Sequence, residues 1–145
     1  MSLILDIADA VTAELNAAPA GTFDPAIAAV RRVLPEFDLA DLAELKVSVV
    51  PKSVVITGST RAASQYEIVV DIGVQKKLGK NLEGEAAHLA TLMDQIADYL
   101  RRRPLSSAPF AAWAGIANEP VYAPEHLAGQ RVFTSVLSVT YRALK

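Results

Sequence analysis

The stretch from Tyr66 to Lys77 reads YEIVVDIGVQKK, and it carries the clearest strand pattern in the chain. Side chains of a β-strand point alternately to its two faces. One face of this stretch is apolar and the other is polar: Tyr66, Ile68, Val70, Ile72 and Val74 against Glu67, Asp71 and Gln75. The pattern predicts a strand with one face in the core and the other in water or against a partner.

An apolar, β-branched segment before it, Leu45 to Val50, predicts a second strand. We expect Pro51 to end this strand, because proline cannot donate a hydrogen bond to the ladder. Residues 53–57 continue it after the break, and residues 58–64 read as a polar loop.

Residues 22–35 give conflicting signals. Asp24 and Pro25 before an Ala-rich run are typical of a helix start. The alternation of Ile27, Ala29 and Val33 favours a strand instead.

Two segments have apolar residues at helical spacing. The first ends near Asn16, and Ser2 can cap its free amides. The second runs from Glu83 to Arg103 and is stopped by Pro104. Residues 38–44 predict one capped turn. The apolar positions are Ile4, Ile7, Ala8, Val11 and Leu15 in the first helix, and Leu89, Leu92, Met93, Ile96 and Leu100 in the second.

The C-terminal segment from Arg131 to Arg142 predicts a long last strand that is apolar on both faces. Such a strand is central in its sheet or covered by another subunit. The preceding segment, Leu105 to Ala128, contains Trp113 and is too long for a tight turn, so it is an interface loop or hides a short strand. The two strand faces consist of Phe133, Leu137, Val139 and Tyr141, and of Val132, Val136 and Thr140.

Length and composition limit the possible functions. The chain has 145 residues, enough for one domain, and a net charge of -2. Proteins that bind nucleic acids or anionic membranes in general usually carry an excess of Lys and Arg, which is absent here. Without cysteine there are no disulfides or thiolate metal sites. Neither His88 nor His126 has a second histidine at ligand spacing, so no metal is implied.

Asp71, Gln75 and Lys77 have the residue types of a metal-dependent nuclease site. Residues four apart on one strand are about 13 Å apart, however, and Val47 to Val50 offers no carboxylate from a neighbouring strand. A solvated strand face is the favoured interpretation. The sequence also lacks a phosphate-binding glycine loop and a nucleophile elbow, so it supports neither an enzyme nor a cofactor.

The only basic run is Arg101, Arg102 and Arg103. It could contact phosphates. At the end of a helix, however, positive charge also suits the macrodipole, and Asp98 and Arg102 are spaced for an ion pair. We favour this structural role.

The chain resembles small tail-completion proteins of tailed bacteriophages and prophages, of the tail-terminator type. The resemblance is carried by four parts of the sequence, which together with the helical N-terminus cover most of it. They are Phe23 to Pro35 followed by Phe37, Asp38, Leu39, Asp41 and Leu42; LKVSVVP at 45–51; YEIVVDIGVQKK at 66–77; and PVYAPEHLAGQRVFTSVLSVTY at 120–141, with Pro120, Val121, Tyr122, Pro124, His126 and Leu127 before the last strand.

The resemblance implies a mixed α/β (α+β) domain. It has an N-terminal helix, a mostly antiparallel sheet, a long helix packed across it and a final strand that returns into the sheet. On this ground we predict a strand at Ala26 to Leu34. The resemblance also implies a homo-oligomeric ring, usually a hexamer, that caps the tail tube and docks the head or neck protein. Such a ring assembles in the host cytoplasm, becomes part of the virion and lets DNA pass only as cargo.

Several residues are candidates for the interfaces of such a ring. A neighbouring subunit would cover the second apolar face of the last strand. Phe110, Trp113 and Tyr122 are candidate docking anchors, although Trp113 could equally belong to the core. Lys76, Lys77 and Lys80 form a basic connection that could contact a tail partner or line a DNA channel, or be a solvated loop. The candidates on the last strand are Val132, Val136 and Thr140.

Two other functions remain as alternatives. One is a head–tail connector or nucleic-acid-binding accessory protein that works through the arginine run. The other is the metal-dependent nuclease described above.

Overall fold

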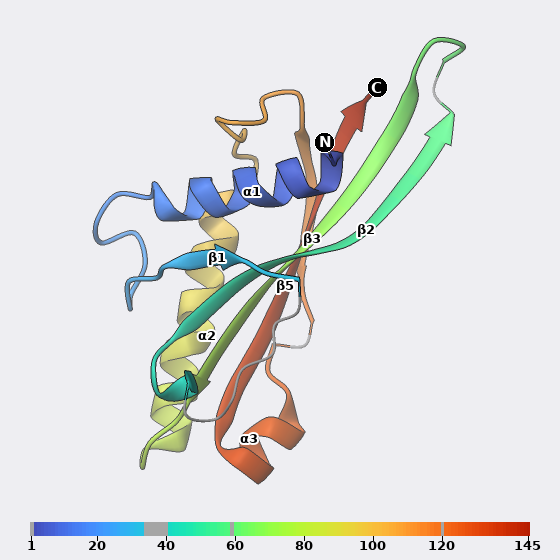
Figure 1. Cartoon of the computed structure of the whole chain (residues 1–145). Helices are drawn as coiled ribbons and strands as arrows, with labels where there is room; N and C mark the ends of the chain where they lie inside the picture. Colours follow the sequence, from blue (N-terminus) through green and yellow to red (C-terminus); the bar gives the residue numbers. More distant parts are fainter. Residues whose placement is uncertain (1, 34–40, 59, 120) are drawn as a thin grey trace.

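The computed structural model describes residues 2–33, 41–58, 60–119 and 121–145. These residues contain three α-helices and five strands, and the first three strands follow one another between α1 and α2 (Figure 1). In chain order they are α1 (Leu3–Asn16), β1 (Ala29–Arg31), a 3₁₀ turn (Asp41–Ala43), β2 (Lys46–Gly58), β3 (Ser64–Lys77), α2 (Leu82–Leu100), β4 (Ala112–Asn118), α3 (Pro124–Gln130) and β5 (Val132–Leu144).

The strands form one sheet in the order β1-β2-β3-β5-β4. β1 is parallel to β2, and every other pair of neighbours is antiparallel. α1 and α2 pack on the same face of this sheet, and β5 enters between β3 and β4 (Figure 1). The α+β fold expected from the sequence is therefore confirmed, with its N-terminal helix, mostly antiparallel sheet, crossing helix and final strand within the sheet.

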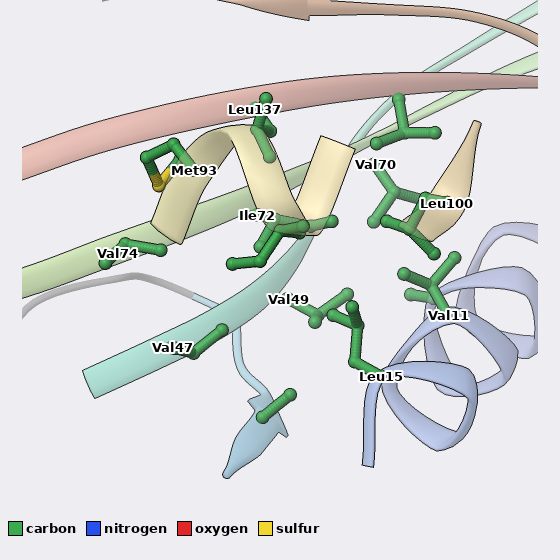
Figure 2. Close-up of a cluster of buried hydrophobic side chains, with 14 of the residues drawn as sticks. Val11, Leu15, Val47, Val49, Val70, Ile72, Val74, Met93, Leu100 and Leu137 are labelled. Atoms are coloured by element: carbon green, nitrogen blue, oxygen red, sulfur yellow. The ribbon is translucent and has the colours of Figure 1, made fainter. Parts of the chain in front are cut away.

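The core lies between the two long helices and the sheet (Figure 2). Val11 and Leu15 of α1 and Leu100 of α2 meet the β3 residues Val70 and Ile72 there. Fully burying a side chain of this size stabilises a protein by about 1.5–3 kcal/mol. The alternation predicted for β3 is confirmed, because its even-numbered residues from 68 to 74 are buried while Glu67, Asp71 and Gln75 are half-buried.

Pro51 does not end β2, contrary to our expectation. The strand continues to Gly58, with an irregular register against β3 between Pro51 and Ser53. Proline is tolerated at edge strands and bulges, where no ladder hydrogen bond is lost. β2 is such an edge here, since β1 pairs with it only at Val47–Val49.

The ambiguous segment contains a strand, but only at Ala29–Arg31. Asn16 at the end of α1 fixes it by hydrogen bonding to both backbone groups of Ala29, which settles the local conflict with helix propensity. Leu34 and Pro35 lie outside the described residues. Residues 38–40 of the expected capped turn also lie outside the described residues. The rest of that segment contains the 3₁₀ turn Asp41–Ala43.

α1 ends at Asn16 as predicted, but its cap and the end of α2 differ from the sequence expectations. Ser2 occupies the N-cap position of α1, but its side chain makes no capping hydrogen bond. α2 ends at Leu100 rather than at Arg103, since the backbone of Arg101 is extended and Arg102 has a φ of 59°. Pro104 restricts the residue before it, which disfavours further helix.

The segment before the last strand hides β4, one of the two alternatives considered, and also α3, which was not predicted. Pro124 begins α3, a position that suits its missing amide and fixed φ. Arg131 is the left-handed cap residue of α3, with a φ of 54°, so the last strand begins one residue later than expected.

Candidate functional site

The two faces of β5 are covered differently. Phe133, Leu137, Val139 and Tyr141 are buried against the helices. On the second face Val136 and Thr140 are half-buried, so they remain candidates for contact with another subunit. Val132 is not a candidate for such a contact, because it lies just after α3 and is only 2% exposed within its own chain. Part of the apolar character of β5 is thus explained by its place inside the sheet.

A small hollow of about 140 Å³ lies on the second face of the sheet. Asp71 and Gln75 both line it, as the alternation predicts. The Oδ1 atom of Asp71 accepts a hydrogen bond from Ser138 Oγ at 2.6 Å and lies 4.0 Å from Lys52 Nζ. Among the described residues, no group of three or more His, Cys, Asp or Glu side chains could hold a metal ion. Asp71 therefore has structural partners on both sides.

The hairpin of β2 and β3 extends beyond the helices (Figure 1). We call residues 53–58 and 60–67 the arm. Val54, Val55 and Ile56 of the arm are 38%, 51% and 57% exposed. Because adjacent residues of a strand point to opposite faces, apolar groups are exposed on both faces of the arm. These residues were not among the interface candidates predicted from the sequence, although the three consecutive β-branched side chains at 54–56 were a usable signal.

The three candidate aromatic residues lie in different surroundings. Phe110 and Tyr122 are exposed, whereas Trp113 is half-buried and packs against the core. The Trp113 Nε1 atom is buried without a hydrogen-bond partner in the described part of the chain. Phe110 borders a shallow groove of about 380 Å³ near the arm, together with Gln65 and the exposed Leu144. Trp113 thus belongs with the core, while Phe110 and Tyr122 remain available for docking.

The basic connection predicted around Lys76 is placed differently. Lys76 and Lys77 are the last two residues of β3. Of the three lysines, only Lys80 lies in the connection between β3 and α2. Because β3 begins in the arm, these lysines lie at the opposite end of the sheet from Val55. Lys76 borders a groove of about 450 Å³ that also contacts His88, whose Nε2 is 3.7 Å from Asp24 Oδ1. The predicted interface residues therefore do not form one surface.

All three residues of the arginine run are exposed, and Arg103 makes the closest contacts with the rest of the chain. Arg103 places its guanidinium carbon 3.8 Å from the centre of the Tyr99 ring, and its Nε donates to the Tyr99 carbonyl at 2.8 Å. The expected Asp98–Arg102 pair is replaced, because Arg101 Nη2 approaches Asp98 Oδ1 at 3.9 Å instead. Arg101 and Arg102 lie beyond the helix on the surface.

A buried carboxylate joins the ends of α1 and α2. Glu14 is 7% exposed, and its Oε1 accepts a hydrogen bond from the Ser106 amide at 2.6 Å. Burial alone would raise the pKa of Glu14, but the hydrogen bonds from Ser106 and the charge of Arg103 outweigh it and lower that pKa. The Tyr99 hydroxyl donates to the Glu14 carbonyl at 3.1 Å. This cluster ties the end of α1 to the end of α2 and to the segment that follows α2.

Comparison of the chain with models of known protein families finds no match, and comparison with curated proteins finds none either. In the described residues, no helix is both long and apolar enough to cross a membrane. The fold and the exposed surfaces are therefore the features from which we infer a function.

Proposed function

We propose that this protein is the subunit of a homo-oligomeric ring that caps a phage tail tube and gives the head or neck protein a surface to dock on. The order and packing of its elements agree with what the resemblance to tail-terminator proteins implies. The work of such a ring is binding, with no bond made or broken. The hexameric form, the tube partner and the virion location are parts of this proposal.

The observation that carries the proposal is the exposed apolar run Val54, Val55 and Ile56 on the arm. A strand edge with exposed apolar side chains promotes association with other chains. Natural proteins usually protect such edges with charges or cover them, and here the described chain leaves the run exposed. Burial of this apolar run between neighbouring copies in a closed ring would explain why the single chain leaves it exposed.

A second observation fits the same function. Val136 and Thr140 on the second face of β5 are half-buried rather than solvated. Exposed Phe110 and Tyr122 lie at separate places on the surface. A ring subunit needs contacts to its neighbours, to the tube below and to the neck above. Separate surfaces suit this requirement better than one shared site.

The capping activity can be tested with the tail-tube protein encoded in the same genome. Tubes are assembled from that protein with increasing amounts of this chain and measured by negative-stain electron microscopy. We expect shorter tubes that carry one additional ring at an end. An unrelated protein of similar size serves as control. Tubes of unchanged length, with no density added at either end, would contradict the proposal.

A further inference from the structure

The sheet has two edges that no described strand pairs. β1 pairs with β2 only at Val47–Val49, so the edge of β2 from Val50 to Gly58 has no described neighbour. At the other side of the sheet, β4 is the last strand in the order. Unpaired edges offer backbone N–H and C=O groups to another strand.

These two edges lie at the same height along the strands. One row of paired residues runs from Val55 through Glu67 and Arg142 to Ala112. Another row runs across the sheet from Val50 and Asp71 to Ser138 and Ala117. A second copy turned about an axis along the strands would therefore bring its β2 edge beside β4 without a large shift.

The strand directions fit such a repeat as well. Three antiparallel steps separate β2 from β4, so the two strands run in opposite directions. Cyclic repetition around an axis along the strands keeps β2 of each copy in the same direction. The junction between β4 of one copy and β2 of the next is then an antiparallel pair, which a two-strand ladder accommodates readily.

The side chains of the two edges differ in size. The arm offers the exposed Val54, Val55 and Ile56. The β4 sequence AWAGIAN is rich in Ala and Gly, and Trp113 and Ile116 pack toward the core. Small residues on one edge leave room for large ones on the other, which favours close packing between unlike edges over pairing of two arms.

These features point to a second copy of this chain as the occupant. The two edges of the sheet are level, run in opposite directions and differ in side-chain size, so one edge of each copy matches the other edge of the next. Charge does not oppose this contact. β4 carries no charged residue, and Lys52, the charged residue of β2 between Val50 and Gly58, lies with its Nζ 4.0 Å from Asp71 Oδ1 of its own chain.

We infer that the arm edge of β2 in one copy adds as an antiparallel strand to the β4 edge of the next copy. This contact is heterologous, so it generates a ring when the rotation closes. The inference rests on the proposed ring and identifies the surfaces that form it. Main-chain hydrogen bonds would supply affinity, and the apolar arm side chains would supply packing.

Charges placed at Val55 and Ala112 test the inference, because these two residues lie on one row of the sheet and face each other across the junction. One variant carries Val55→Glu and Ala112→Glu, and a second carries Val55→Lys and Ala112→Glu. The first brings like charges together, so the concentration needed for half-assembly should rise by about tenfold or more. The second brings opposite charges together and should assemble more readily than the first. Thermal melts by circular dichroism check that each variant is folded.

Cross-linking gives a second readout, because the chain has no cysteine of its own. The double variant Val55→Cys with Ala112→Cys should form a ladder of covalent oligomers under mild oxidation. The matched variant Lys80→Cys with Ala112→Cys places its first thiol between β3 and α2, outside the arm, and should not form a ladder. Ladder formation in the first variant alone supports the inference.

Two results would overturn the inference, and they separate it from the ring itself. Rings that form normally in both charge variants, with no Val55–Ala112 ladder, would mean that the ring exists but uses other surfaces. A wild-type chain that stays monomeric at every concentration, alone and with tubes, would remove both the ring and this contact. Equal impairment of both charge variants would indicate pairing of arms, which sets like charges together in each, and would also refute the inference.

Discussion

Asn16, the last residue of α1, holds Ala29, the first residue of β1, by two hydrogen bonds. Its Nδ2 donates to the Ala29 carbonyl at 2.9 Å, and its Oδ1 accepts from the Ala29 amide at 2.8 Å. Asn16→Ala should lower the free energy of unfolding by about 1–3 kcal/mol, because both backbone groups lose their partner. Asn16→Asp keeps the acceptor but sets a second carboxylate oxygen against the Ala29 carbonyl at the C-terminus of a helix, so it should destabilise the protein too. Urea denaturation measures both, and an unchanged midpoint in Asn16→Ala would contradict this role.

Arg103 and Arg101 make a matched pair for testing the structural reading of the arginine run. Arg103 stacks on Tyr99 and donates to its carbonyl, whereas Arg101 has one long surface ion pair. Arg103→Ala should destabilise the protein by about 1 kcal/mol. Arg101→Ala should change stability by less than about 0.5 kcal/mol. Equal melting temperatures for the two variants would show that the contacts of Arg103 are not significant.

The stability of the protein should depend on Glu14 at acidic pH. The pKa of Glu14 is lowered from its ordinary value of 4.5, so the carboxylate stabilises the folded state above that value. This stabilisation is lost as the pH falls through the lowered pKa. Glu14→Gln should be less stable than wild type by about 1 kcal/mol at neutral pH. Denaturation series should show the difference shrinking below pH 4.5. A constant difference down to pH 2 would be incompatible with this assignment.

Tyr141 predicts the opposite behaviour at alkaline pH. Its side chain is fully buried, and its hydroxyl has no hydrogen-bond partner among the described residues. Burial, assisted by the charge of Glu14, raises the pKa of Tyr141 above its ordinary value of 10.0. The folded state therefore loses stability as the pH rises above that value, because the unfolded chain releases this proton more readily. Tyr141→Phe should be neutral or stabilising by up to about 1 kcal/mol at pH 7 and less sensitive to alkali. A loss above 2 kcal/mol would reveal a hydroxyl partner that this account omits.

The arm should contribute little to the stability of a single chain. Ile72→Ala in the core should cost about 2–5 kcal/mol, since that side chain is completely buried. Ile56→Ala in the arm should cost less than about 1 kcal/mol in dilute solution, because its side chain is mostly exposed. Chemical denaturation of both variants checks the contrast. A similar loss in both would mean that the arm packs within its own chain.

The predictable parts of this fold are those where local pattern and tertiary packing agree. The alternation around Ile72 and the helical stripe around Met93 both reflect one-sided burial, so they could be read directly from the sequence. Two residues do not behave as their local sequence predicts. Pro51 does not end its strand, and Arg131 caps α3 instead of beginning the last strand. Pro51 lies on a strand edge where its missing amide costs nothing, and that edge depends on how far β1 extends.

The candidate interface was predicted less well, for a physical reason. Exposure depends on which other segments lie against a residue, and the sequence does not show this for Val132 or Trp113, which their own chain covers. The arm was not predicted as an interface, because residues 54–56 lack the alternation of polar and apolar side chains that marks a strand buried on one face. An unbroken apolar run on a strand without cover became visible only in the arrangement of the sheet.

Sedimentation velocity across a wide concentration range tests whether copies of this chain form the proposed closed ring. We expect a discrete particle of six subunits that grows at the expense of the monomer as the concentration rises, with no larger species following it. A single monomer boundary at all concentrations, both alone and with tubes, or open-ended growth into ever larger polymers, would contradict it.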